Sequence, residues 1–337
     1  MIRAAEEGHI VFFCLSDSGL FAGKEPKMKM IDLHCDTMSE LAKRGLGFDN
    51  EITAVSQNQV AAAGFSAYAQ CFALFVEEDD DIAAAIKWNE YERVFHRQLV
   101  KYQDRMLLAA SYKELVDAVQ EGRIAALLTC ENASAFGGNL ARIEMMKKRG
   151  CIMASLTWNG RNSLAGGASA QEYGLSEFGK KAVAEMERCR MLVDISHLSD
   201  RATEDFFQIA IRPFVASHSN CRSLCRHPRN LPDEYISEII QRRGLIGINF
   251  FKGFLCSGED KTAGFSEIGD HIEHLLKLGG SEVIALGSDY DGAEVPSEIG
   301  GIGQIEALYT YLTDRIGRAL TEKVFFMNAD AFFQQNL

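Results

Sequence analysis

Five apolar stretches of this 337-residue chain carry, at or just after their ends, side chains that could bind a metal ion or transfer a proton. The first stretch, "MIDLHCDTM", contains His34 and Asp36, two residues apart. The other four lead to Glu131 in "LLTCEN", His197 in "ISHLS", His218 in "ASHSN", and Asp289 and Asp291 in "GSDYDG". A single H-x-D pair or a single histidine at a strand end is weak evidence, because such residues are more often structural. Five strand ends with such residues favour one shared site.

The chain alternates between apolar runs and segments with the helical period of 3.6 residues. The apolar runs predict eight strands, at residues 29–35, 66–76, 123–130, 151–157, 191–196, 213–217, 244–250 and 282–288. The segments between them predict helices at residues 81–105, 111–121, 139–149, 177–190, 199–210, 232–243, 264–279 and 303–317. This alternation predicts an α/β fold of one domain, a TIM-like (β/α)8 barrel. A doubly wound open sheet is the alternative, but its usual Gly-rich first turn is absent.

The C-terminal ends of the strands meet on one face of such a barrel, where active sites lie. Residues two apart on a strand point the same way, about 6.6 Å apart at their Cα atoms, so His34 and Asp36 can converge on one ion. His197 and His218 follow neighbouring strands, about 4.8 Å apart, and can share a second ion. Histidine and carboxylate ligands with open positions suit catalytic Zn²⁺.

Two carboxylates complete this predicted site. Glu131 lies across the mouth of the barrel between the two pairs, so its two oxygens can each bind a different ion. Asp289 follows the last strand, which neighbours the first strand in a closed barrel, and is therefore expected beside the first ion. Two zinc ions about 3.5 to 4 Å apart form the two-metal site used in hydrolysis.

Seven motifs, in this order and spacing, carry a resemblance to a known family: "DLHCDT", "LLTCEN", "ISHLS", "ASHSN", "HPRNLPD", "GINF" and "GSDYDG". From about residue 30 to the C-terminus the chain resembles the membrane dipeptidase (renal dipeptidase) family of zinc peptidases, and is closest to its soluble bacterial members. The resemblance implies a TIM-like barrel with two zinc ions per subunit. One ion would be bound by the first histidine–aspartate pair, the other by the two later histidines, and both by the bridging Glu131. It also implies that Asp289 is the catalytic carboxylate and that Arg229 binds the free carboxylate of a dipeptide, a role suited to bidentate guanidinium recognition.

Two positions depart from the pattern of the mammalian members. Trp158, in "SLTWNGRN", stands where they have a histidine, and Phe251 stands where they have a tyrosine. Both family residues act near the substrate carbonyl or carboxylate. We therefore expect Trp158 and Phe251 to lie at the substrate and to affect specificity.

The predicted function is a zinc-dependent dipeptidase that cleaves dipeptides with a free C-terminal carboxylate, L,D-dipeptides included, by a metal-bridging hydroxide. One alternative is a binuclear amidohydrolase-like enzyme that opens lactams or lactones, for which Arg229 would have little use. Another is a non-catalytic metal-binding scaffold, for which Asp289 would be superfluous.

The net charge of −12 argues against a surface for phosphate backbones or anionic lipid, so we expect no nucleic-acid and no membrane partner. Nine cysteines without a C-x-x-C pair predict reduced thiols and a cytoplasmic protein. A homodimer is one oligomeric state that we expect the chain can form. Residues 1–27 precede the first predicted strand and are interpreted as an N-terminal extension, with the barrel at residues 28–337.

Three further histidines and one aspartate are not assigned to the metal site. His271 and His274, at i and i+3, are expected on a solvated helix surface. His227, near Arg229, could touch the site or pack a loop. Asp291 could support the site or fix the turn with Gly292.

Overall fold

A closed parallel barrel forms the centre of the protein, of which this computed structural model describes residues 28–257 and 263–337. The predicted extension at residues 1–27 lies outside the described residues and stays a prediction. Eight strands pair side by side around the barrel, and the β2–β4 pairing closes it. They are β1 (Lys29–Cys35), β2 (Ala67–Phe75), β4 (Ile124–Glu131), β5 (Cys151–Ser155), β6 (Leu192–Asp194), β7 (Val215–Ala216), β8 (Leu245–Ile248) and β9 (Ile284–Leu286). The single-domain (β/α)8 prediction is confirmed.

A ninth described strand, β3 (Met106–Leu108), was not predicted. It pairs with the first half of β4, whereas β5 pairs with the second half. Three residues are too few to show a period in the sequence, and this strand forms because β4 offers it a free edge. The segment between β2 and β4 therefore holds β3 in addition to the two expected helices, α3 and α4.

All eight predicted helices are present, most of them a few residues shorter than predicted. They are α3 (Asp81–Lys101), α4 (Tyr112–Gln120), α5 (Ala141–Lys148), α6 (Glu177–Arg188), α7 (Asp200–Ile209), α8 (Asp233–Gln241), α10 (Phe265–Lys277) and α11 (Ile305–Ile316). Those not predicted are α1 (Thr37–Arg44), α2 (Gln57–Ala63), α9 (Lys252–Leu255), α12 (Arg318–Glu322) and α13 (Asn328–Asn336), three 3₁₀ turns at η1 (Ala133–Phe136), η2 (Ser297–Ile299) and η3 (Ile302–Gln304), and a π-helical turn at η4 (Lys323–Met327). No helix in the described ranges is both long and apolar enough to span a membrane.

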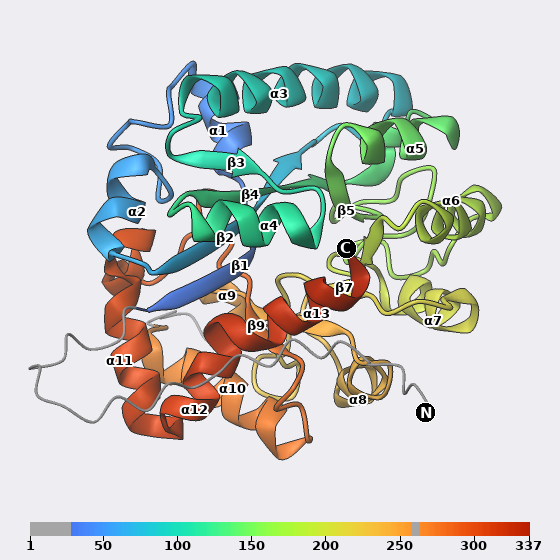
Figure 1. Cartoon of the computed structure of the whole chain (residues 1–337). Helices are drawn as coiled ribbons and strands as arrows, with labels where there is room; N and C mark the ends of the chain where they lie inside the picture. Colours follow the sequence, from blue (N-terminus) through green and yellow to red (C-terminus); the bar gives the residue numbers. More distant parts are fainter. Residues whose placement is uncertain (1–27, 258–262) are drawn as a thin grey trace, which may run out of the picture.

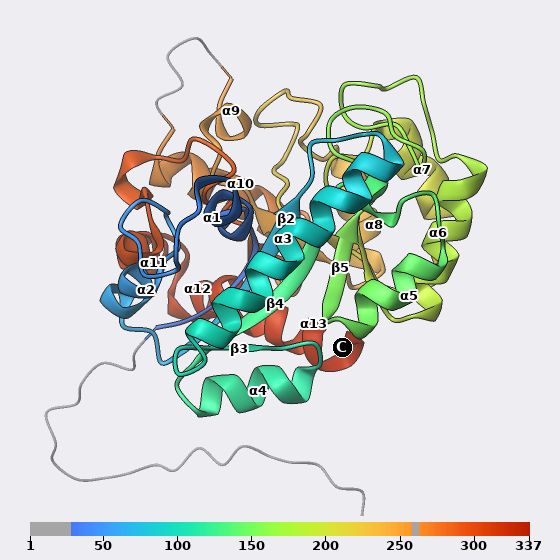
Figure 2. The same ribbon diagram turned by 90° about the horizontal axis from the view of Figure 1, so that it is seen from above.

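The barrel interior is apolar along most of its length. One buried cluster contains residues from all eight barrel strands, among them Ile31, Leu127 and Val215, and only the interior can bring these strands together. Phe332 and Phe333 of α13 join this cluster, so α13 closes one end of the barrel (Figure 1). Figure 2 shows α4 and α13 at that end and α9 at the opposite end. A second cluster packs the outer strand faces against the helices.

An irregularity in β1 sets the direction of the first two predicted ligands. Leu33 belongs to the interior cluster and Cys35 to the outer one, although they are two residues apart. The pairing of β1 with β2 shifts register between Asp32 and Cys35, as a β-bulge does, and the extra residue reverses the alternation. His34 is thereby turned toward the barrel mouth, while Cys35 packs in the outer core.

Candidate metal centre and active site

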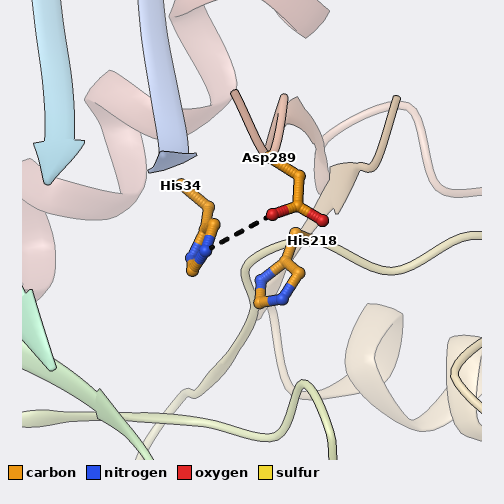
Figure 3. Close-up of side chains that lie close together, drawn as sticks. All are labelled: His34, His218 and Asp289. Carbon is orange, nitrogen blue, oxygen red and sulfur yellow. Dashed lines mark ion pairs between the residues drawn. The ribbon is translucent and has the colours of Figure 1, made fainter. Parts of the chain in front are cut away.

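Six predicted residues meet at the C-terminal ends of the strands, beside a cavity of about 370 Å³. His34 and Asp36 come from the end of β1, and Glu131 is the last residue of β4. The other three follow β6, β7 and β9: His197, His218 and Asp289. Figure 3 shows His34, His218 and Asp289 turned toward one another. The structure thus brings together residues that are up to 255 positions apart in the chain.

Glu131 lies between two groups of potential ligands. Its Oε2 is 3.4 Å from His34 Nε2, and its Oε1 is 2.7 Å from His197 Nε2 and 3.9 Å from His218 Nε2. Asp36 Oδ2 also lies 3.4 Å from His34 Nε2, so His34 and Asp36 form the ligand group on the Oε2 side of Glu131. The two carboxylate oxygens therefore face different ligand sets, which is the arrangement of a bridging carboxylate.

The hydrogen bonds of His197 and His218 show which ring nitrogen is free. His197 Nδ1 lies 3.0 Å from Asn159 Oδ1, an acceptor, and so carries the proton. His218 Nδ1 lies 2.7 Å from Ser217 Oγ, which donates its own proton to Asp194 and so accepts from the ring. Both Nε2 atoms then present lone pairs, although they are only 2.8 Å apart and close to Glu131. A cation between them would resolve this repulsion, so the donor set fits a metal ion.

The protonation of the two histidines agrees with this assignment. Burial and, after it, the charge of Arg229 lower the pKa of His197 to about 4. Burial also holds the pKa of His218 well below its ordinary value. Both rings are therefore neutral near pH 7, which is the form that binds a metal.

In the other ligand group, His34 Nε2 and Asp36 Oδ1 are buried without a hydrogen-bond partner among the described residues. Burial lowers the pKa of His34, but the charges of Glu131 and Asp36 raise it more. Burial and the charge of Glu131 raise the pKa of Asp36 to about 7. Asp36 is also the N-cap residue of α1 but makes no capping hydrogen bond with its side chain, which leaves the carboxylate to the site. Unpaired buried groups of this kind are costly unless they have a ligand.

The side chain of Asn249, which was not predicted to be part of the site, holds Asp289 in place. Asn249 donates from Nδ2 to Asp289 Oδ2 over 2.9 Å, and Asp289 Oδ1 faces His34 Nε2 at 3.7 Å. The backbone of Asn249 exchanges two hydrogen bonds of 2.9 Å with the Asn220 side chain, and Asn249 Oδ1 accepts from the N–H of Phe251 over 2.6 Å, which orients its amide. The motif "GINF" contains Asn249, so the only signal in the sequence was its place at the end of a strand. Burial raises the pKa of Asp289, while the charge of His34 and the bond from Asn249 lower it.

The backbone at these strand ends adopts an unusual conformation. Asn132, His197, Asp289 and Asp291 all have positive φ, between 63° and 73°. Gly292 follows directly, and a Cβ there would overlap Asp36 Oδ2 and approach Asp289 Oδ1 to 2.7 Å. Left-handed non-glycine residues cost free energy and cluster at functional sites. Glycine is needed at position 292 for the close approach of two carboxylates.

Arg229 lines the same cavity and is 5% exposed. Its Nη2 donates to the carbonyl of His218 over 3.4 Å, its Nε has no partner among the described residues, and its guanidinium lies 5.3 Å from the Phe254 ring centroid. No carboxylate of the described residues is within ion-pairing distance of it. Burial lowers the pKa of Arg229 to about 10, so the group is still charged near neutral pH. A buried cation that has no carboxylate partner among the described residues calls for an anionic ligand.

Trp158 and Phe251 also line the cavity. Trp158 tilts against Phe75 at the end of β2, and Phe251 packs edge to face against Phe254. The residue after Trp158, Asn159, orients His197 and was not singled out in the sequence.

The remaining residues have structural partners. The prediction for His271 is wrong: it is fully buried, accepts from the backbone N–H of Cys221 over 3.1 Å and donates to the carbonyl of Leu255 over 3.0 Å. His274 contacts Asp233 and Ser223, and His227 packs against Phe254. Asp291 accepts from Thr37 Oγ1 over 2.5 Å and from the N–H of Ala54 over 2.7 Å, so it ties the β9 loop to the segment after β1.

Two known dipeptidases have sequences similar to that of this chain. The sequence is 28% identical to an uncharacterized dipeptidase of Schizosaccharomyces pombe, over 74% of this chain and 62% of that protein. It is 26% identical to the dipeptidase tcpJ of Claviceps purpurea, over 81% of this chain and 65% of that protein. The chain thus spans less than two thirds of the length of these two relatives.

The fold is similar to that of a metallo peptidase from Rhodobacter sphaeroides, solved with a phosphinate mimic of the dipeptide L-Ala-D-Ala. The TM-score is 0.85 at 21% identity, over 92% of this chain and 100% of that chain. Residues 25–330 match the family described as membrane dipeptidase, peptidase family M19. Because this match covers most of the sequence, the chain belongs to the membrane dipeptidase family of metallopeptidases.

Proposed function

We propose that the chain is a zinc-dependent dipeptidase that hydrolyses dipeptides with a free C-terminal carboxylate. The observation that carries this proposal is Arg229, a buried guanidinium without a carboxylate partner among the described residues, in the same cavity as the ligand cluster. Its charge suits the carboxylate of a short peptide, and a cavity of about 370 Å³ suits a substrate of that size.

The residues of the site would serve either as metal ligands or in proton transfer. His34, Asp36, Glu131, His197 and His218 would hold two zinc ions, with Glu131 between them. When bound, these ions would polarise the scissile carbonyl and lower the pKa of a shared water. Asp289 would take the proton of the attacking water and give it to the leaving amine, with Asn249 holding Oδ2 so that Oδ1 faces the cluster.

The test is a panel of dipeptides with purified, zinc-loaded protein. We expect hydrolysis of L,L-dipeptides with a free carboxylate and much slower hydrolysis of the same dipeptides as C-terminal amides. L,D-dipeptides belong in the panel because the metallo peptidase of Rhodobacter sphaeroides carries a mimic of L-Ala-D-Ala. Equal rates on acid and amide would contradict the role of Arg229.

The alternative, an enzyme that opens lactams or lactones, needs its own assay. Neutral cyclic substrates have no carboxylate for Arg229 to bind. We therefore expect Arg229→Met to raise the KM for dipeptides strongly. Turnover of lactones that is unchanged by Arg229→Met, with no turnover of dipeptides, would replace the proposed function by this alternative.

A cytoplasmic location and a homodimer stay proposals. The eight cysteines of the described residues are free thiols, which supports a reducing compartment. Gel filtration coupled to light scattering would decide the assembly.

A further inference from the structure

We propose that Trp158 and Phe75 form the wall that receives the side chain of the amino-terminal residue, and that the enzyme prefers dipeptides with a large apolar or aromatic residue there. This inference rests on the proposed dipeptidase function. It deepens that function, because it assigns the substrate class to two residues of this chain.

The two rings form a continuous apolar surface on one side of the cavity. Their centroids are 5.2 Å apart with a tilt of 55°, and both side chains line the cavity. Phe75 is the last residue of β2 and is paired in register with Glu131, so its ring lies beside the ligand cluster. An apolar substituent placed there leaves water and contacts the rings, and both effects favour binding.

Neighbouring contacts hold this wall in place. Asn159 is bonded through its side chain to His197, which fixes the residue next to Trp158. The carbonyl of Trp158 lies so close to Gly167 that a Cβ there would overlap it. Lys43 Nζ, itself 3.1 Å from Glu40 Oε1, lies 5.4 Å from the Phe75 ring centroid, within cation–π distance. The surface is therefore preformed.

The position of Arg229 decides which residue of the dipeptide meets this wall. Arg229 and its neighbour Phe254 follow β7 and β8, whereas Phe75 ends β2 and Trp158 follows β5. In the barrel order β1-β2-β4-β5-β6-β7-β8-β9 these are opposite sides of the mouth. A carboxylate on Arg229 places the carboxyl-terminal residue beside Phe254. The amino-terminal residue then extends across the ligand cluster toward Trp158 and Phe75.

The experiment compares kcat/KM for Phe-Ala, Leu-Ala and Gly-Ala with zinc-loaded protein. We expect Phe-Ala and Leu-Ala to exceed Gly-Ala by at least about 10-fold, the size of discrimination that a few methylene groups give in an apolar pocket. Trp158→Ala and, separately, Phe75→Leu should shrink this ratio several-fold. Tyr173→Ala is the matched control, because Tyr173 is an aromatic residue of the same loop, is 38% exposed and lies outside the cavity.

A binding measurement without turnover gives a second readout. Trp88 and Trp158 are the two tryptophans of the chain, and Trp88 is fully buried outside the cavity. Leu-Ala added to zinc-loaded Asp289→Asn protein should change the intrinsic fluorescence, and Trp158→Phe in that background should remove the change.

The outcomes separate the two proposals. Absence of hydrolysis for every dipeptide would overturn the proposed function. Hydrolysis with equal kcat/KM for Gly-Ala and Phe-Ala, or a preference that survives both Trp158→Ala and Phe75→Leu, would overturn this inference and leave the dipeptidase function standing.

Discussion

The two ends of the barrel are built from the same eight strands but bury opposite kinds of side chain. At the C-terminal end, three histidines and three carboxylates lie within a few ångströms of one another, all 9% exposed or less. At the N-terminal end, Phe332 and Phe333 of α13 close an apolar interior. The strands thus carry a stabilising core at one end and a site with strong charge repulsion at the other.

Backbone geometry shows the same contrast. Of the six non-glycine residues with positive φ in the described part of the chain, four lie at the C-terminal strand ends. The other two, Arg190 and Arg243, each lie two residues before the first residue of β6 or β8. Each strained residue costs about 1 to 3 kcal/mol. Burial of the Phe332 and Phe333 rings at the apolar end contributes stabilisation that offsets this cost.

The largest expected effect is on activity, at the C-terminal end. His197→Ala removes one of two facing ring nitrogens and should lower metal content and reduce kcat/KM by at least about 10³-fold, since bound metal contributes several kcal/mol. Metal analysis and dipeptide assays on the same sample measure this. His96→Ala, on the outer face of α3, is the control. Full activity in His197→Ala would refute the assigned site.

The next effect is on stability, at the N-terminal end. Phe333→Ala removes a fully buried ring and should lower the free energy of unfolding by about 3 to 5 kcal/mol. Activity per folded molecule should stay within about 2-fold, because the substitution lies at the opposite end of the barrel. Urea unfolding and active-site titration test both parts. A loss of activity without a loss of stability would show that the two ends are coupled.

Gly292→Ala tests the close approach of the two carboxylates. Its Cβ would overlap Asp36 Oδ2, so we expect Asp36 to move and metal affinity to fall about 10- to 100-fold. Gly300→Ala is the matched control, since the nearest atom to its Cβ would be 3.6 Å away. Competition with a chelator of known affinity gives the measurement. Equal affinities of the two variants would contradict the assignment of Asp36.

Asn249→Ala should have the smallest effect. Without its donor, Asp289 loses the bond that orients Oδ2, and kcat should fall about 10-fold with metal content unchanged. Steady-state kinetics over a range of substrate concentrations separates kcat from KM. A change in KM alone would place Asn249 at the substrate and not behind Asp289.

Local signals predicted most of the fold. Eight strands and eight helices were predicted because the apolar periodicity of such elements can be recognised in consecutive residues. Three features could not be predicted from local signals. The strand β3 forms because it pairs with β4, and α13 forms because it packs against the end of the barrel. His271 is buried, although its helix has the pattern of an amphipathic surface helix. These features depend on partners that are distant in the sequence.

The sequence alone determined the types and order of the site residues and the barrel that positions them, since both follow from short motifs and their spacing. Only the tertiary structure decided how these residues face one another. The bulge in β1 turns His34 inward, Glu131 directs one oxygen to each side, and Asn249 and Asn159 orient Asp289 and His197. The physical reason is closure of the barrel, which sets distances of a few ångströms between residues that no local pattern connects.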